Sequence, residues 1–377
     1  MNTSVSLSVA RALVLEEPRR LVARDLPLPE IGADDGMLRV EACGLCGTDH
    51  EQYDGHLALG YSFIPGHESV GVIEQIGPEA QQRWGVGEGD RVAVEVFQSC
   101  RTCDRCRAGR YRQCRFHGVL DTYGFKNVDT GCGLWGGYAT HQYLAPDSML
   151  LAVPPQLDPV TATLFNPVGA GIRWGVTMPE TGPGDRVAVL GPGIRGLAAA
   201  AAAREAGAEF VMVTGRGPRD APRLAAARDF GADLTVDVAV DDPVVAFRDA
   251  AGHGADVVVD VTARAPAAFV QAIDLARPGG TVVVAGTRAG AVVPDFDPDH
   301  IVLKELRVLG ALGVDVAAYR AALELLVSGA YPFASLSRRT VGLAGVSGLL
   351  EVMSGGDDAV PPIHGVVVPN LDEGELR

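Results

Sequence analysis

The feature that most constrains the fold of this chain is a glycine-rich turn between an apolar strand and an alanine-rich helix, VAVLGPGIRGLAAAAAAREAG. Its glycines have the spacing G-x-G-x-x-G. Glycine at these positions allows a tight turn and a close approach of the backbone to a pyrophosphate, which the N-terminus of the following helix attracts. The stretch predicts a dinucleotide site at Gly191, Gly193, Ile194, Arg195 and Gly196.

The surroundings of this turn predict an α/β unit, because apolar strands alternate with helix-length segments and such alternation builds a parallel sheet. The expected strands are 186–190, 210–214, 234–238, 256–261, 281–286 and 306–311.

The rest of the chain predicts a second domain, since 377 residues exceed one comfortable core. Residues 1–160 are rich in Gly and Pro with short β-branched runs, which predicts an irregular all-β unit. After an amphipathic helix at 316–329, a short strand at 364–369 indicates that the tail returns to this first domain.

The end of the second strand bears on the choice of dinucleotide. A carboxylate about twenty residues beyond the glycines would accept a hydrogen bond from the adenosine ribose. This chain has Gly215 and Arg216 there, and the nearest acid is Asp220. A guanidinium binds a 2′-phosphate bidentately, so we predict that NADP is preferred over NAD. The alternative is that Arg216 covers the adenine and that NAD is accepted.

The segment CRTCDRCRAGRYRQC predicts a structural zinc site. Four closely spaced thiolates suit a tetrahedral zinc with no open position. Six arginines in and beside the segment would offset the charge of the thiolates, whereas a nucleic-acid patch is disfavoured because the whole chain carries a net charge of −15. The expected zinc ligands are Cys100, Cys103, Cys106 and Cys114.

A second set of metal-ligand residues lies in CGLCGTDHEQYDG and PGHESVGVIEQIG. Cys46, His67 and Glu68 offer a thiolate, an imidazole and a carboxylate, which together suit zinc. Because the four-cysteine segment accounts for a structural zinc, Cys43 is expected to be a small buried thiol rather than a partner of Cys46.

The order of the motifs is typical of the zinc-dependent medium-chain alcohol dehydrogenases: the two stretches above are followed by GEGDRVAVE, the four-cysteine segment, GGYATHQYL and GPGIRG. The chain resembles the polyol, sorbitol and threonine dehydrogenase branch of this family over nearly its whole length. The resemblance implies a GroES-like irregular β catalytic domain at 1–167 and 312–377, with a zinc lobe at about 98–116. It implies a Rossmann-fold doubly wound parallel sheet at 168–311, an active site in the cleft, and a homodimer or homotetramer.

The same resemblance implies roles for individual residues. Cys46 and His67 match the first two ligands of a catalytic zinc, and Glu68 matches an acid at or just behind the metal. Asp49 matches an acid that orients a ligand imidazole, and Thr48 matches the hydroxyl that relays the substrate proton. Zinc would polarise the substrate oxygen while hydride passes to or from the nicotinamide.

Two positions depart from the family pattern. Many relatives have a histidine three residues after the threonine, where this chain has Glu51; the neighbouring His50 is either a relay residue or an exposed histidine. LFNPVGAG places Asn166 where the polyol branch has a glutamate. Three outcomes are therefore open: zinc held by Cys46, His67 and Glu68, zinc held weakly with help from Asn166, or no catalytic zinc.

The resemblance implies a zinc-dependent oxidoreductase that transfers hydride between NADP(H) and a secondary alcohol or ketone, either polyol-like or a biosynthetic intermediate. The alternative is a medium-chain reductase of an activated carbon–carbon double bond without catalytic zinc, and a third reading is a non-catalytic dinucleotide-binding protein. A small-molecule substrate is expected in all but the last. Residues 1–20 lack the pattern of a signal peptide and no long uncharged apolar run occurs, so a cytoplasmic protein without nucleic-acid or membrane partners is expected.

Overall fold

The computed structural model describes residues 9–57, 60–293, 296–354 and 360–371. The first eight residues of the N-terminal segment considered above lie outside this part. Within the described part of the chain, none of the helices has the length and the apolar run needed to cross a membrane.

The chain forms two compact units, one made of Met1–Leu164 with Ser337–Arg377 and the other of Phe165–Leu336. The first division lies three residues before the expected boundary at 167, but the second unit continues well beyond 311. The reason is that the helix Val316–Ser328 packs against the start of the same unit. The ring centroid of its Tyr319 lies 4.9 Å from that of Phe165.

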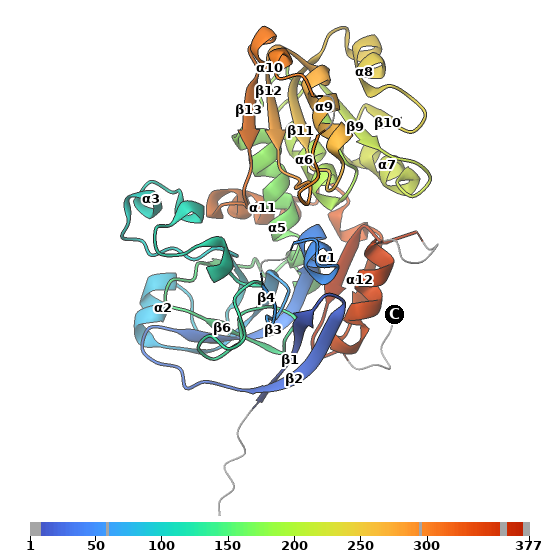
Figure 1. Cartoon of the computed structure of the whole chain (residues 1–377). Helices are drawn as coiled ribbons and strands as arrows, with labels where there is room; N and C mark the ends of the chain where they lie inside the picture. Colours follow the sequence, from blue (N-terminus) through green and yellow to red (C-terminus); the bar gives the residue numbers. More distant parts are fainter. Residues whose placement is uncertain (1–8, 58–59, 294–295, 355–359, 372–377) are drawn as a thin grey trace, which may run out of the picture. The chain divides into compact units, whose positions relative to one another are not determined.

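The first unit is built on an antiparallel sheet (Figure 1). One parallel pair of strands completes this sheet at its C-terminal edge. Its strands and helices are β1 (Val9–Glu17), β2 (Arg20–Pro27), β3 (Gly36–Leu45), α1 (Gly47–Tyr53), β4 (Glu68–Ile76), α2 (Pro78–Trp84), β5 (Arg91–Val94), α3 (Asp104–Arg107), β6 (His141–Leu144), β7 (Leu150–Ala152), α4 (Pro159–Ala162), β14 (Arg338–Val341), α12 (Val346–Ser354) and β15 (His364–Val367). The strand order is β14-β15-β3-β4-β5-β7, and β6 also pairs with β3. The C-terminal tail therefore returns to the first domain, as predicted.

The register of this sheet brings two motifs together. Strands β3 and β4 pair antiparallel, with Cys43 opposite Ser69 and Gly44 opposite Glu68. Residues that follow the end of β3 therefore meet residues that precede β4. Cys46 and His67 occupy these two positions.

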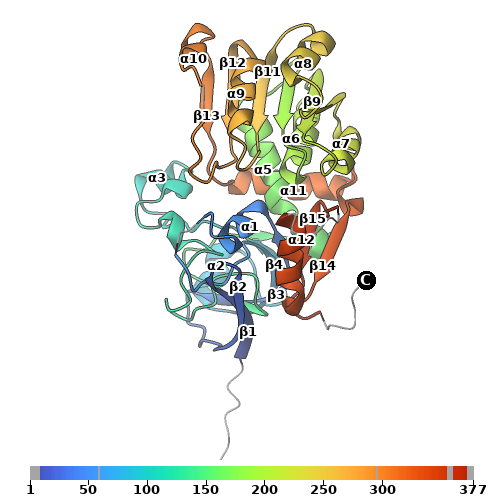
Figure 2. The same cartoon turned by 45° about the vertical axis from the view of Figure 1, so that its right-hand side comes forward.

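The second unit is a six-stranded parallel sheet, seen with its strands side by side in Figure 2. Its elements are α5 (Phe165–Ile172), β8 (Arg186–Leu190), α6 (Ile194–Glu205), β9 (Phe210–Gly215), α7 (Ala221–Ala227), β10 (Leu234–Asp237), α8 (Pro243–Ala251), β11 (Ala255–Asp260), α9 (Pro266–Leu275), β12 (Ala276–Val284), α10 (Asp299–Leu303), β13 (Arg307–Gly310) and α11 (Val316–Ser328). The strand order β10-β9-β8-β11-β12-β13 is that of a doubly wound dinucleotide-binding sheet.

The strand order reverses between β8 and β11, and the glycine-rich turn follows β8 at this switch point, where such sheets bind ligands. The predicted strands are present within a few residues of their expected bounds. Proline and glycine often end a helix, but the Pro-Gly-Gly at 278–280 lies beyond the end of the preceding one. Helix α9 ends at Leu275, and the proline and glycines already belong to β12.

Candidate active site

The residues expected to hold a catalytic metal come together at the junction of β3, α1 and β4. The Sγ atom of Cys46 lies 3.2 Å from Nε2 of His67. One ligand atom each of Cys46, His67 and Glu68 lies within 4.8 Å of the others. The three residues are only 4%, 6% and 1% exposed. Such a buried set of one sulfur, one nitrogen and one carboxylate fits a zinc ion.

The charge of this cluster favours a cation. Burial opposes the charged form of the imidazole, but the negative groups of Cys46, Asp49 and Glu68 outweigh that effect and raise the pKa of His67 to about 10. A site that holds a proton this firmly has an excess of negative charge, and a bound metal takes the place of such protons.

The neighbouring cysteine is not part of the cluster. Cys43 is fully buried; its Sγ donates to the carbonyl oxygen of Gly44 at 3.5 Å and accepts a weak hydrogen bond, at 3.8 Å, from the hydroxyl of Ser69. Burial, together with the carboxylate of Asp49, raises the pKa of the Cys43 thiol well above its ordinary value. The prediction that Cys43 is a buried thiol is confirmed.

Asp49 supports the backbone on both sides of the cluster. Its Oδ2 accepts a hydrogen bond from the backbone N–H of Cys46 at 2.9 Å, and its Oδ1 accepts one from Gly66 at 3.2 Å. The same Oδ1 lies 3.8 Å from Nδ1 of His67, too far for a direct hydrogen bond. Asp49 thus fixes the backbone that carries the two candidate metal ligands, Cys46 and His67, more directly than it fixes the imidazole.

Helix α1 carries the residues expected to move a proton. Thr48 and Glu51 are three residues apart and so share a face of the helix, whereas His50 lies about 160° away from Thr48 around its axis. Glu51 is 7% exposed and His50 is 9% exposed. The expectation of an exposed histidine at position 50 is therefore wrong, because the segment is a packed helix rather than an extended loop.

The departure at position 166 has partners that the sequence did not indicate. Asn166 begins α5 beside Phe165 and is 3% exposed. Its Nδ2 donates to the hydroxyl of Tyr319 at 2.9 Å, and its Oδ1 accepts a hydrogen bond from Arg195 at 3.3 Å. The guanidinium of Arg195 also lies over the ring of Trp174, 5.8 Å from its centroid. Both ends of the amide are thus engaged within the second unit.

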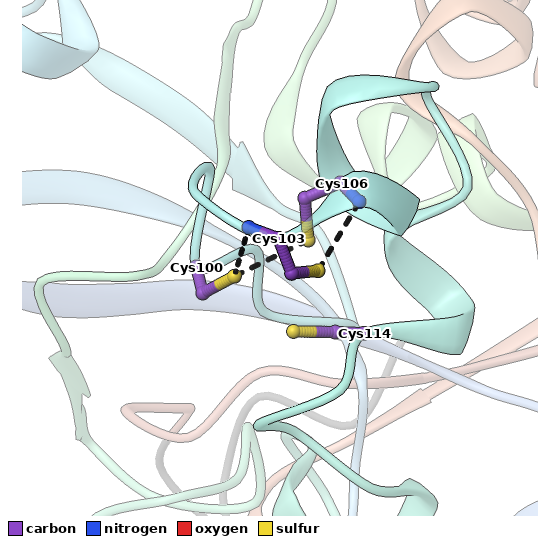
Figure 3. A group of neighbouring side chains, drawn as sticks. All are labelled: Cys100, Cys103, Cys106 and Cys114. Atoms are coloured by element: carbon purple, nitrogen blue, oxygen red, sulfur yellow. Dashed lines mark hydrogen bonds between the residues drawn. The ribbon is translucent and has the colours of Figure 1, made fainter.

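The four predicted zinc-lobe cysteines converge around α3, and Figure 3 shows their sulfur atoms turned toward one another. The sulfur atoms all lie within 4.8 Å of one another. Backbone N–H groups donate to three of them at 3.4 Å, a pattern that stabilises thiolates. Although desolvation acts in the opposite direction, hydrogen bonds from Thr102 and from the backbone lower the pKa of Cys100 to about 6. These residues fit a closed structural zinc site.

The arginines of this lobe are only partly free to offset the thiolate charge. Arg115 makes two hydrogen bonds to the carboxylate of Asp104, at 2.5 and 2.9 Å. Arg105 donates to the side-chain oxygen of Gln113 at 2.7 Å. Part of the basic character of the segment therefore holds the lobe together.

The glycine-rich turn borders a pocket of about 730 Å³ in the second unit. A Cβ atom at Gly196 would stand 1.8 Å from the carbonyl oxygen of Gly191, so the turn tolerates no side chain there. At the end of β9 the pocket is lined by Arg216, Asp220 and Arg223. This arrangement suits a dinucleotide whose phosphates lie on the turn.

Two protein-family descriptions match the chain: "Alcohol dehydrogenase GroES-like domain" over residues 32–155 and "Zinc-binding dehydrogenase" over residues 196–328. The chain is 70% identical over 363 residues to a probable alcohol dehydrogenase of Mycobacterium tuberculosis, covering 96% of this chain and 99% of that protein. It is 29% identical to a probable D-xylulose reductase A of Arthroderma otae, covering 94% and 97%.

A solved structure from Sinorhizobium meliloti, described as a zinc-binding dehydrogenase bound to NADP, aligns with a TM-score of 0.82 at 29% identity and covers 96% of this chain and 100% of that one. Together with the GroES-like and Rossmann-like units, these likenesses agree with the metal-ligand residues and the glycine-rich turn described above. The chain therefore belongs to the zinc-dependent medium-chain alcohol dehydrogenases and is an NAD(P)-dependent enzyme.

Proposed function

We propose that this enzyme transfers a hydride between NADP(H) and a secondary alcohol or ketone of polyol-like structure, with a catalytic zinc at Cys46, His67 and Glu68. The observation that carries the proposal is the convergence of these three buried residues within 4.8 Å. The relative named as a D-xylulose reductase supports a polyol-like substrate, since reduction of a ketose to a polyol is this chemistry.

The protein's own groups position the reaction and move a proton. When bound, zinc would supply a Lewis acid for the substrate oxygen. The hydroxyl of Thr48 accepts the alcohol proton and passes it on, and Glu51, on the same face of α1, is the next acceptor. Asp49 keeps the backbone at Cys46 and Gly66 in place through its two hydrogen bonds.

Asn166 is not among the proposed ligands. Its side-chain oxygen already accepts a hydrogen bond from the cationic guanidinium of Arg195, and a neutral amide is a weaker zinc ligand than a carboxylate. Counting the closed site at the four cysteines, we propose two zinc ions per chain. A homodimer or homotetramer in the cytoplasm, as the family resemblance implies, belongs to the same proposal.

The preference for NADP rests on the charge of the pocket at the end of β9. Among the described residues that line it, the charged ones are two arginines and one aspartate, which leaves a net positive charge of one (2 − 1). A 2′-phosphate is attracted by such a site and can take bidentate hydrogen bonds from Arg216. The NADP bound to the Sinorhizobium meliloti neighbour is consistent with this choice.

Metal analysis of matched cysteine variants tests the proposal. The wild-type protein should contain two zinc ions per chain, and Cys46→Ala should contain one and lose alcohol oxidation. Cys43→Ala is the control, since it removes a buried thiol from the same motif and should keep both ions and the activity. One zinc in the wild type that persists in Cys46→Ala, together with reduction of activated double bonds, would establish the zinc-independent alternative instead.

A further inference from the structure

The end of strand β9 has no room for the acidic side chain that often marks an NAD site. A Cβ atom built on Gly215 would stand 2.9 Å from Cγ of Pro192 and 3.0 Å from both Cβ of Asp220 and Cγ of Leu224. The space that a side chain at position 215 would enter is therefore already filled. Part of what fills it is the side chain of another acid, Asp220.

Asp220 lines the pocket with its carboxylate held on both sides. Its Oδ2 accepts a hydrogen bond from the backbone N–H of Arg216 at 2.9 Å, and its Oδ1 lies 3.2 Å from Nη1 of Arg223. The side chains of Arg223 and Asp220 are only 17% and 19% exposed, so water screens this ion pair less than it would a fully exposed one. The wall of the pocket thus contains a carboxylate whose charge is offset by an arginine one helical turn further along.

We propose that the Asp220–Arg223 pair determines how this enzyme discriminates at the 2′ position of the adenosine ribose. The inference rests on the proposed NADP preference and assigns residues to it. An unpaired carboxylate here would accept a hydrogen bond from the 2′-hydroxyl of NAD(H) and would repel the 2′-phosphate of NADP(H). Paired with Arg223, Asp220 does neither, and the positive charge of Arg216 decides the choice. Arg223 thus neutralises a carboxylate that would otherwise favour NAD(H).

The test is the ratio of the dissociation constants of NADPH and NADH, measured by fluorescence titration. Arg223→Leu keeps the apolar stem and removes the guanidinium. It should weaken NADPH and strengthen NADH, moving the ratio toward NADH by about 10-fold or more, the size expected when a charge-assisted contact is lost. Arg216→Leu is the matched control, because it should weaken NADPH without strengthening NADH.

The double variant Arg223→Leu/Asp220→Asn separates neutralisation of the carboxylate from a merely structural role. Without the carboxylate, the gain in NADH affinity should disappear. Equal weakening of both cofactors in Arg223→Leu, or a gain in NADH affinity that survives Asp220→Asn, would overturn the inference. If Arg223→Leu fails to fold, Arg223→Gln makes the same test with a polar side chain. If the wild type prefers NADH, the proposed NADP preference fails, yet the shift produced by Arg223→Leu still tests the pair.

Discussion

The buried histidine of the C-terminal strand β15 predicts how the stability of this enzyme depends on pH. His364 is 1% exposed, its Nδ1 accepts a hydrogen bond from Nε of Arg338 at 2.9 Å, and its Nε2 lies 3.2 Å from the hydroxyl oxygen of Thr163. That hydroxyl donates to the carbonyl of Val160, so it accepts the proton of Nε2. Burial and the charge of Arg338 lower the pKa of His364 to about 3.

The sign and the size of the effect follow from this pKa. In the unfolded chain the imidazole titrates near its ordinary value of 6.5. Below that value the unfolded state binds a proton that the folded state excludes, so stability is full above pH 6.5 and falls as the pH falls toward 3. Each pH unit in this window removes about 1.4 kcal/mol of the free energy of unfolding. Between pH 7 and pH 5 the loss is about 2 kcal/mol.

His364→Gln removes the titration while keeping one acceptor and one donor. The assay is urea unfolding of both proteins, with zinc present, at pH 7 and pH 5. The wild type should lose about 2 kcal/mol more than the variant between the two pH values. His253→Gln, at an exposed histidine, is the control and should follow the wild type. Equal losses in wild type and His364→Gln would refute the reasoning, because they would show that His364 is not held neutral by the fold.

Two further predictions concern the metal sites. Thr48→Val should lower the rate of alcohol oxidation by about 100-fold or more, because it removes a positioned proton carrier, whereas Thr48→Ser should retain most of the activity. Unchanged NADPH binding by Thr48→Val would show that the cofactor pocket is intact. A fully active Thr48→Val would exclude Thr48 as the proton relay. Cys114→Ser should reduce the zinc content to one ion per chain and lower the thermal midpoint, since a structural zinc contributes directly to folding; two retained ions would mean that the four cysteines do not hold a metal.

The sequence predicted the parallel sheet well for a physical reason. Strands that are buried on both faces contain continuous apolar runs, such as 187–190 in β8 and 257–259 in β11, and these are easy to locate between helices. The end of the second unit was harder to place. The amphipathic pattern of Val316–Ser328 predicts that one face of this helix is buried, but not which domain it packs against. In the structure, the contact of Tyr319 with Phe165 places the helix in the second unit.

The candidate site was predictable in its members and not in their surroundings. Ligand type and the family resemblance of the motifs pointed to Cys46, His67 and Glu68, which the register of β3 and β4 brings together. The burial of His50 depends on helix α1, which has only seven residues and is too short to show a periodic apolar pattern in the sequence. The partners of Asn166 are 29 and 153 residues away along the chain, and contacts at such separations leave no local pattern in a sequence.

The contact between Asn166 and Arg195 has a consequence for the evolution and engineering of this enzyme. A carboxylate introduced at position 166 would stand beside the guanidinium of Arg195 and form a partly buried ion pair with it. A glutamate at position 166, the residue that the polyol branch has there, would then be held by Arg195. Residues in contact do not vary independently, so positions 166 and 195 form an epistatic pair. A library that restores glutamate at 166 should therefore vary 195 in the same clones.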